Sequence, residues 1–268
     1  MAFTGPNYKR LSSDKNVTIA LAPTGAATGL SNVFEPEQSE LVYGGAGAFL
    51  NASPAVSWND FDFGIQESDR ESDPSLADDS TFEDFGQQNY GGGISFFYPK
   101  FYDDASSDLS NVYDVTEHEW TLVDVVQRID GEKPNNTAIE DGDFVHAMRT
   151  ITDGEDNTLE GSDALRRTVQ FLSQGEVAVY TVVGDHDLTP VEPANAWAEG
   201  NKARLRVTIQ GRDVTNMDTI SFLSDDPDVV RITAGGFYEV TGSPSDTATI
   251  TIVDEGAGTS ETVSVTVT

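Results

Sequence analysis

Histidine is scarce and cysteine is absent in this chain of 268 residues, although both are frequent choices for acid–base and nucleophilic chemistry. It contains three histidines and no cysteine, which excludes disulfide scaffolds, thiolate metal sites and cysteine nucleophiles. His118 lies between two glutamates, His146 in an alternating apolar segment, and His186 between two aspartates. The sequence has neither a His-Glu-x-x-His zinc motif nor a Gly-x-Ser-x-Gly nucleophile turn. We therefore expect exposed or half-buried structural histidines and no catalytic residues.

The acidic run at residues 153–160 is the best candidate for a cation site. An EF-hand loop beginning at Asp153 would require Gly in place of Thr158 and Glu in place of Ala164, so this motif fails. A nonstandard calcium site stays open as the alternative. A solvated turn at a hairpin tip fits the run better, and we expect no metal ligands and no cofactor-binding residues.

The glycine run Gly91–Gly93 also fails as a phosphate site. It precedes an expected strand, whereas phosphate-cradling loops follow a strand and open a helix. The run predicts a bend or a flexible loop base. Paired carboxylates for glycoside hydrolysis cannot be singled out among 46 acidic side chains. No specific catalytic signal remains, and we expect the protein not to be an enzyme.

The charge of the chain limits its partners. The 46 acidic side chains against 15 Lys and Arg give a net charge of −31, which argues against binding a phosphate backbone. The first ten residues lack the apolar stretch of a signal peptide, and there is no long uncharged apolar run. We expect a chain made in the cytoplasm, with no membrane partner.

The charge and the prolines divide the chain. Residues 1–188 carry 34 acidic and 10 basic side chains, whereas residues 189–268 carry 12 and 5. Pro190 and Pro193 interrupt regular structure near the change in composition. We expect one domain over residues 1–188, a linker over 189–200 and a second domain over 201–268.

The second domain reads as a small β-sandwich. Polar and apolar residues alternate with period two over residues 205–209, 248–253 and 262–267, and turn-forming residues separate these runs. The candidate core residues are Phe222, Val230, Ile232, Phe237, Val240, Ile250, Ile252, Val263 and Val265.

The first domain also reads as mainly β, with one helix expected from Asp104 to about His118 and Ser106 or Ser107 as its N-cap. Its acidic segment 66–93 is expected to be mobile in a monomer and ordered against neighbouring subunits through Phe82 and Phe85. The strands are expected from runs of β-branched and aromatic residues at 17–21, 94–98, 120–126, 144–148, 168–172 and 177–183.

Several segments of residues 1–188 follow one another in a recognisable order. They are Asp62-Phe63-Gly64, Tyr90-Gly91-Gly92, Phe97-Tyr98-Pro99, residues 103–107, residues 125–131 and Thr168-Val169-Gln170-Phe171. This order resembles that of the major tail (tail tube) proteins of long-tailed bacteriophages. The likeness implies a tail-tube β-sandwich or barrel with one helix. It implies hexameric rings that stack into a virion tail tube, with tape measure, terminator and distal tail proteins as partners. Double-stranded DNA would pass through the lumen without specific binding during genome ejection.

Residues 201–268 resemble bacterial immunoglobulin-like (Ig-like) domains of the Big2 type. The likeness is carried by residues 220–232, 235–242, 248–252 and the final alternating strand. Phe222 stands where such domains often have Trp, and it keeps a large apolar side chain at that position. The resemblance implies an Ig-like domain displayed on the outside of the tube.

The acidic composition agrees with a DNA conduit, because an attractive wall would hold the duplex through many phosphate contacts. The ten cations of residues 1–188 are then expected to pair with carboxylates at subunit contacts. An adaptation to salt or a merely soluble surface would give the same composition without a lumen. The alternatives are another virion structural protein (capsid decoration or tail terminator), a cell-surface Ig-like adhesin, and an enzyme.

Overall fold

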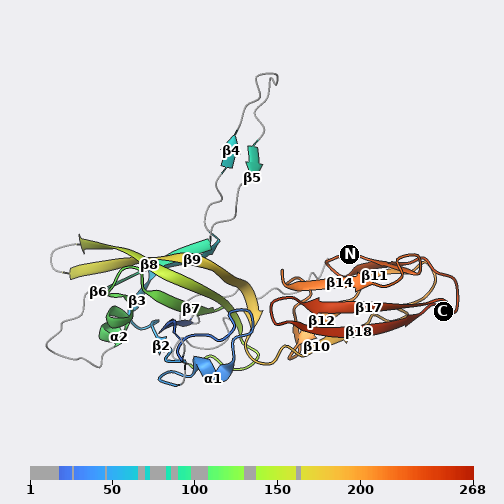
Figure 1. Cartoon of the computed structure of the whole chain (residues 1–268), viewed down its shortest axis with the longest axis horizontal. Helices are drawn as coiled ribbons and strands as arrows, with labels where there is room; N and C mark the ends of the chain where they lie inside the picture. Colours follow the sequence, from blue (N-terminus) through green and yellow to red (C-terminus); the bar gives the residue numbers. More distant parts are fainter. Residues whose placement is uncertain are drawn as a thin grey trace, which may run out of the picture. The chain divides into compact units, whose positions relative to one another are not determined.

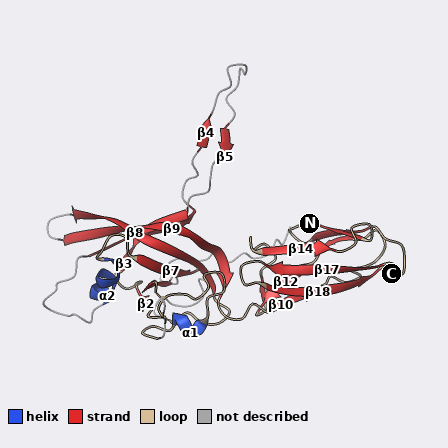
Figure 2. Ribbon diagram, in the orientation of Figure 1, coloured by secondary structure: helices blue, strands red, loops and turns tan. Residues whose placement is uncertain are grey.

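The computed structural model shows a mainly β protein in two compact units, which confirms the expected fold class (Figures 1 and 2). The N-terminal unit comprises Met1–Val33, Ser39–Ile139 and Val145–Val179. The C-terminal unit comprises Phe34–Gln38, Glu140–Phe144 and Tyr180–Thr268. The residues that the structure describes are 18–25, 27–45, 47–65, 70–72, 83–85, 90–97, 108–129, 137–160 and 164–268.

A seven-stranded sheet forms most of the N-terminal unit and curls into a half-barrel (Figure 1). Its strand order is β2-β1-β7-β8-β9-β6-β3, and the registers described between its strands are antiparallel. The strands are β1 (Thr18–Pro23), β2 (Leu50–Asn51), β3 (Val56–Ile65), β6 (Tyr90–Phe97), β7 (Leu122–Arg128), β8 (Phe144–Glu160) and β9 (Ala164–Val182).

Strands β8 and β9 are longer than the sequence predicts. The acidic run 153–160 continues β8, so its interpretation as a solvated turn is wrong. The two strands expected at 168–172 and 177–183 form one strand, in which Gly175 takes a φ of 90° and its N–H donates to Ser173 Oγ at 3.1 Å. Hydrogen bonds between the backbones of neighbouring strands form whatever the side chains are. The neighbouring strands β8 and β9 can therefore extend through polar sequence.

The glycine run lies in the sheet, so the prediction of a bend or loop base is wrong. Gly91 and Gly92 belong to β6, where they pair with Leu172 and Phe171 of β9. On its other side β6 pairs with β3. A Cβ on Gly93 would lie 3.0 Å from Gln170 Oε1, so glycine here allows close packing of adjacent strands.

Among the residues that the structure describes, two helices accompany the sheet. The helix α2 (Asp108–Thr116) confirms the expected helix, and the predicted caps Ser106 and Ser107 lie outside the described residues. The hydroxyl of buried Thr116 donates to the Val112 carbonyl at 2.8 Å. The second helix, α1 (Gln38–Leu41), is a single turn that buries Leu41.

The core of the N-terminal unit lies between the curled sheet and α2. Alternate residues of β1, β6, β7 and β9 point into it, as the period-two rule requires. Val112 adds an apolar contact from α2. The buried members are Ile19, Leu21, Ala52, Ala55, Ile94, Phe96, Val112, Val123, Val125, Val169 and Phe171.

Within the acidic segment 66–93 the structure describes two short strands ahead of β6. They are β4 (Arg70–Ser72) and β5 (Glu83–Phe85), which pair antiparallel. Phe82 and the side chain of Phe85 lie outside the described part, so their role against a neighbouring subunit stays a prediction.

Three small antiparallel sheets form the C-terminal unit, with orders β10-β12-β13, β11-β16-β15 and β14-β17-β18. The longest pair is β17 with β18, whose register runs from Thr247↔Thr266 to Asp254↔Thr259. The strands are β10 (Leu188–Val191), β11 (Lys202–Arg204), β12 (Arg206–Ile209), β13 (Arg212–Asp213), β14 (Ile220–Ser224), β15 (Val230–Ile232), β16 (Phe237–Val240), β17 (Thr247–Asp254) and β18 (Thr259–Thr266).

The core of this unit contains most of the expected residues, with one error of register. Phe237 is 58% exposed, whereas the adjacent Tyr238 is 4% exposed and donates its hydroxyl to the Ala196 carbonyl at 2.9 Å. Ile232 is partly buried against the cluster. The other candidates are buried: Phe222, Val230, Val240, Ile250, Ile252, Val263 and Val265.

Residues 189–200, expected to be a linker, pack against the rest of the C-terminal unit. Leu188 and Val191 bound β10, which pairs with β12 in the register Pro190↔Val207. Ala196 is buried, and the ring of Trp197 lies 4.9 Å from that of Tyr238. Within the chain segments described, neither helix is long and apolar enough to cross a membrane.

Candidate assembly surfaces

Strand β3 offers the longest exposed edge in the described sheet. It spans ten residues and stands last in the strand order, and β2, which ends the opposite side, has only two. An edge strand presents N–H and C=O groups to any further strand that can reach it. At roughly 3.3 Å per residue, β3 gives an edge of about 33 Å. The two ends of the sheet are therefore candidate contacts between subunits.

A hollow of about 610 Å³ lies beside β2 in the same unit. Tyr43, Phe49 and Leu50 line it from the segment before and within β2, and Asp114 and Val115 line it from α2. Burial raises the pKa of the Tyr43 hydroxyl to about 12, against the opposing charge of Arg128. The hollow mixes apolar and polar groups.

A buried charge cluster connects the neighbouring strands β7 and β8 to the chain segment that follows β1. Asp124 on β7 is fully buried and accepts hydrogen bonds from the Leu30 N–H at 2.7 Å, the Thr24 hydroxyl at 2.9 Å and Arg149 Nε at 3.0 Å. The hydrogen bond to Asp124 raises the pKa of Arg149. A Cβ on Gly29, which has a φ of 80°, would clash with Asp124 Oδ2. Glycine is therefore required where the chain passes this carboxylate.

Two further arginines of the N-terminal unit are buried. Arg128 is fully buried and donates through Nη1 to the carbonyls of Thr137 and Ala138, both at 3.2 Å. Arg167 is 1% exposed and donates through Nη2 to the Thr116 carbonyl at 2.7 Å. Arg128, Arg149 and Arg167 thus make contacts within their own chain, whereas the sequence suggested pairing at subunit contacts.

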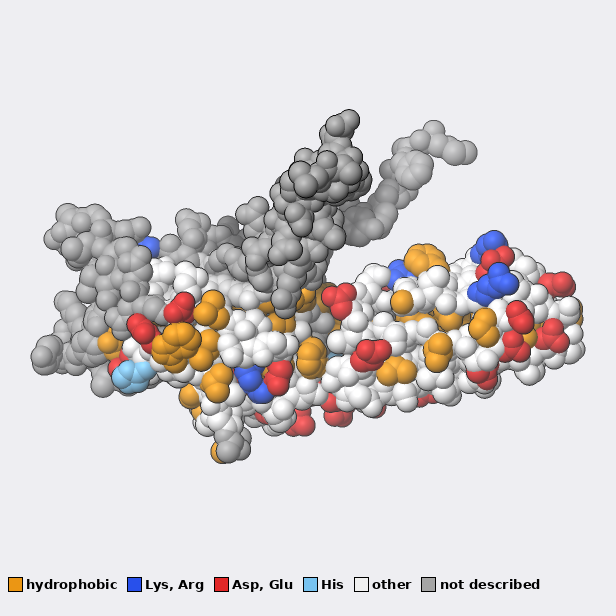
Figure 3. Space-filling view, turned by 45° about the horizontal axis from the view of Figure 1, so that its top comes forward, with side chains coloured by type: hydrophobic (Ala, Val, Ile, Leu, Met, Phe, Trp, Pro, Cys, Tyr) orange, Lys and Arg blue, Asp and Glu red, His pale blue; other side chains and the backbone are white. Residues whose placement is uncertain are grey.

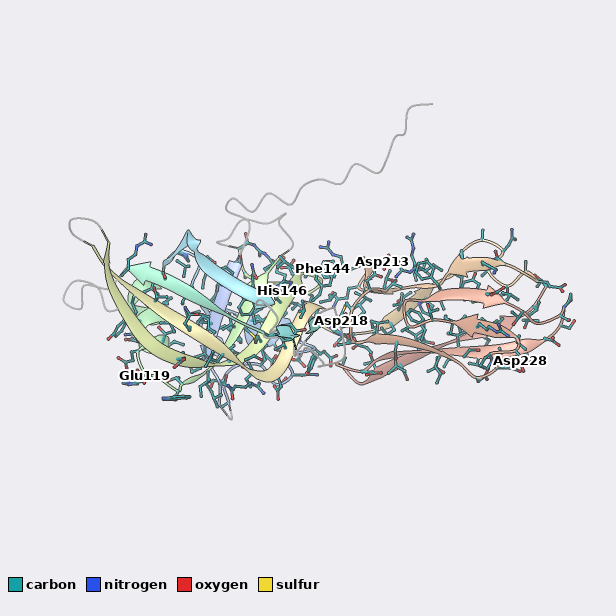
Figure 4. All side chains as sticks on the ribbon, turned by 90° about the horizontal axis from the view of Figure 1, so that it is seen from above. Glu119, Phe144, His146, Asp213, Asp218 and Asp228 are labelled. Carbon is teal, nitrogen blue, oxygen red and sulfur yellow. The ribbon has the colours of Figure 1, made fainter. Side chains whose placement is uncertain are left out.

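The three histidines occupy different environments. His118 is exposed, with Nε2 at 3.1 Å from the Glu117 carboxylate. His146 on β8, labelled in Figure 4, is half-buried, and burial lowers its pKa. His186 is 1% exposed, so the expectation of an exposed or half-buried side chain is wrong for this residue.

His186 forms a buried ion pair within the C-terminal unit. Its Nδ1 lies 2.8 Å from Asp254 Oδ2, and its Nε2 lies 2.8 Å from the Val182 carbonyl oxygen. Both partners are acceptors, so both ring nitrogens must donate, which is the protonated form. Burial opposes that charge, but the hydrogen bonds that His186 donates to Asp254 and Val182 outweigh it and raise the pKa of His186. The pair joins the end of β9 to the end of β17.

The alternative of a calcium site at residues 153–160 gains no support from the geometry of the described residues. In the part of the chain that the structure describes, no three His, Asp or Glu side chains converge to hold a metal ion. Asp153 is half-buried on β8, and the side chains of residues 154–160 lie outside the described part. The calcium alternative therefore stays untested at these residues.

The model of one protein family, described as phage tail tube protein, matches residues 5–186. The chain belongs to the phage tail tube protein family. It is therefore a structural protein of the virion tail and not an enzyme. Proteins of this family assemble with copies of themselves and with other tail components. A search of curated proteins finds no match.

The family match extends over the curled sheet, from β1 through β9, and ends close to the start of the small sheets. Sequence reasoning found the tail tube segments but missed the buried arginines and the His186–Asp254 pair. The signal for His186 was present only in part: an Asp-His-Asp run shows charge, but its partner Asp254 lies 68 positions away.

Proposed function

We propose that this chain forms hexameric rings that stack into the tail tube, and that the tube delivers the genome through a negatively lined bore. The support is the family match over residues 5–186 together with the curled seven-stranded sheet in the same residues. Six copies per ring is the number that the resemblance to major tail proteins implies.

The sheet edges support ring formation. A curled sheet repeated around an axis encloses a bore when the edge of each copy meets the next copy. Strand β3 at one end and β2 at the other are available for such pairing among the described strands. Closure into a ring removes the exposed edges that would otherwise favour aggregation.

The charge supports passage of DNA without specific binding. Residues 1–188 carry 34 acidic side chains, and the described cations Arg128, Arg149 and Arg167 bind groups within the chain. The seven other cations of residues 1–188 are outnumbered by the 34 carboxylates, so repeated subunits give a repulsive lining over a Debye length of roughly 10 Å at 0.1 M salt.

We propose that residues 201–268 form an Ig-like domain displayed outside the tube. The alternating strands and the burial of Phe222 at the expected core position support this assignment. The unit would be dispensable for ring formation, with the tube domain made by residues 1–188. Tape measure, terminator and distal tail proteins are the proposed further partners, and the host cytoplasm is the proposed site of synthesis.

Neutralising the bore tests the proposed conduit. Several bore-facing carboxylates, identified from the assembled tube, are changed together to the corresponding amides in the phage. Tubes should still form and genome ejection should slow, because the wall then repels the duplex less. The matched control neutralises the exposed carboxylates Asp225, Asp228 and Glu261 in the C-terminal unit and should leave ejection unchanged. Unchanged ejection in the bore variant would contradict the conduit.

Removal of the C-terminal strands tests the domain assignment. A chain that stops after Asp187 loses β10 together with its partner β12, so no unpaired half of that sheet remains. Electron microscopy should still show rings or tubes. Circular dichroism establishes that the shortened chain is folded, and a folded chain that never assembles would place residues 188–268 in the ring contact.

A further inference from the structure

One face of the C-terminal unit concentrates positive charge in an otherwise acidic chain. Lys202, Arg204 and Arg231 are three of the five cations in residues 201–268, and they line one hollow of about 510 Å³ with Phe237 and Glu239. We call these five residues the basic face. Figure 3 shows blue side chains on this unit gathered beside an orange patch, with red side chains among them.

The strand register explains why these side chains share a face. Lys202 on β11 and Arg231 on β15 both pair with Glu239 of the central strand β16. Arg204 pairs with Phe237 two residues along, which is the same side of the sheet. The three cations thus surround one carboxylate and one exposed aromatic ring.

Contacts within the unit hold two of the cations in place. Lys202 Nζ lies 2.9 Å from Glu239 Oε1, and this hydrogen bond lowers the pKa of Glu239. The guanidinium of Arg204 lies 4.8 Å from the centre of the Phe237 ring, and its Nε donates to the Gly235 carbonyl at 2.9 Å. A second nitrogen of Arg204 donates to Asn216. Held cations lose less side-chain entropy when they bind a partner.

The composition of the basic face is typical of a protein interface. Phe237 is 58% exposed, and its ring adjoins the three cations. Arginines and aromatic residues are enriched among the side chains that dominate binding energy at interfaces. The excess of three cations over one carboxylate indicates that the partner is acidic.

The other described cations are engaged elsewhere. Arg128 and Arg167 are buried, and Arg149 binds Asp124 and Glu176. In the C-terminal unit, Arg212 donates to the Gly142 carbonyl at 3.1 Å, and Arg206 lies 3.9 Å from Asp213, which Figure 4 labels. In the described part of the chain, the exposed positive charge therefore gathers mainly on the basic face.

Copies of a chain with a net charge of −31 repel one another over long range, and a local positive surface favours contact where the C-terminal unit of one copy meets another copy. The rings proposed above would hold neighbouring copies close, and a weak contact then suffices because the effective concentration is high. A foreign polyanion would have no such tether and would meet the full repulsion of the chain.

We propose that the basic face binds surface carboxylates of a second copy of this chain within the assembled tube, an inference that rests on the proposed function. The guanidinium and ammonium groups of one copy donate charge-assisted hydrogen bonds to the carboxylates of its neighbour. Phe237 adds apolar area at the centre of that contact.

Zero-length crosslinking of the full chain tests the proposal. Unlabelled and ¹⁵N-labelled protein are mixed before assembly, treated with a carbodiimide that joins amines to carboxylates in contact, and digested for mass spectrometry. Lys202 is the only lysine among the residues that the structure describes. Its crosslink to Glu239 of the same copy is the internal standard. Crosslinks from Lys202 that combine both isotopes mark contacts between copies.

We expect mixed-isotope crosslinks at Lys202 in the wild type, decreasing several-fold at 0.5 M salt. Arg231→Glu should reduce them several-fold, whereas the matched variant Arg206→Glu, which changes another exposed arginine outside the basic face, should not. If electron microscopy shows tubes but Lys202 crosslinks only to Glu239 of the same copy, this inference alone would be overturned. Absence of rings and tubes in the wild type would overturn the proposed function and this inference together.

A titration with a polyanion distinguishes a foreign polyanion from a second copy of this chain as the occupant of the basic face. Fluorescent dextran sulfate is titrated into wild-type protein and into Arg231→Glu, with neutral dextran as the control. Weak binding that the substitution does not change agrees with a second copy as the occupant. Tight binding lost in Arg231→Glu, together with no mixed-isotope crosslinks, would overturn the proposal in favour of a foreign polyanion.

Discussion

The two units of this chain use their few cations in opposite ways. The N-terminal unit buries Arg128 and Arg167 and pairs Arg149 with the buried Asp124, whereas the C-terminal unit exposes Lys202 and Arg231 on one sheet face. A buried arginine contributes to a fixed internal geometry, and an exposed cation is available to a partner. The difference indicates that charge in the family-matched part stabilises the curled sheet, and it underlies our proposal that charge in the second unit binds a partner.

Breaking the buried cluster should have the largest effect. Asp124→Ala leaves Arg149 without its buried carboxylate partner and removes acceptors from Leu30 and Thr24. Loss of one partner of a buried pair costs about 3–5 kcal/mol, so the free energy of unfolding of the N-terminal unit should fall by that amount. Urea unfolding measures it. Glu176→Gln removes the exposed partner of the same arginine and should cost less than about 1 kcal/mol; equal losses in the two variants would contradict the role of burial.

Cavity formation in the C-terminal unit comes next. Ile252 on β17 is fully buried, and Ile252→Ala should lower the free energy of unfolding of that unit by about 2–5 kcal/mol. Amide hydrogen exchange checks this because it follows each unit separately. Leu223 is 69% exposed, so Leu223→Ala should change the free energy of unfolding measured by exchange by no more than about 0.5 kcal/mol. If Ile252→Ala also loosened the N-terminal unit, the two units would not be energetically independent.

The histidines should give the two units opposite pH responses. The pKa of His186 is raised in the folded state, so its stabilisation is complete below the unfolded pKa of about 6.5 and is lost as pH rises through the folded value. His186→Gln should therefore destabilise the C-terminal unit more at pH 5.5 than at pH 8.5. Hydrogen exchange at the two pH values measures this, with exposed His118→Gln as the control.

His146 should behave in the reverse sense. Its pKa is lowered by burial, so the stabilisation is present above the unfolded pKa and is lost as pH falls toward the folded value. His146→Gln should cost the N-terminal unit less at pH 5.5 than at pH 8.5. A cost that is greater at the lower pH would show that His146 is charged in the folded protein.

Sequence patterns identified strands well where alternation was long. Residues 248–253 and 262–267 became β17 and β18, because period-two burial fixes both the strand and its inward face. At Phe237 and Tyr238 two aromatic residues are adjacent, so the pattern could not tell which one points inward, and a slip by one residue reverses the face. Pro190 suggested a linker but lies in β10, which ends its sheet and so tolerates a missing N–H.

Other features depend on contacts that no local pattern contains. The sequence predicted a bend or loop at Gly91 and Gly92 because glycine is rare in strands. These residues nevertheless lie in β6, because β6 pairs with β3 on one side and with β9 on the other. Arg128 is buried because the carbonyls of Thr137 and Ala138 satisfy its donors. The sequence could predict the class of fold and the family. The partners of the buried charged side chains could be identified only from the structure.

Electron cryomicroscopy of the purified full chain after assembly is the most direct test of the central claim. We predict stacked rings of six copies, with the curled sheet of the N-terminal unit around a bore lined by carboxylates and the C-terminal unit on the outside. The buried Asp124–Arg149 pair should lie within each copy. Monomers alone, or filaments without a continuous bore, would contradict the account.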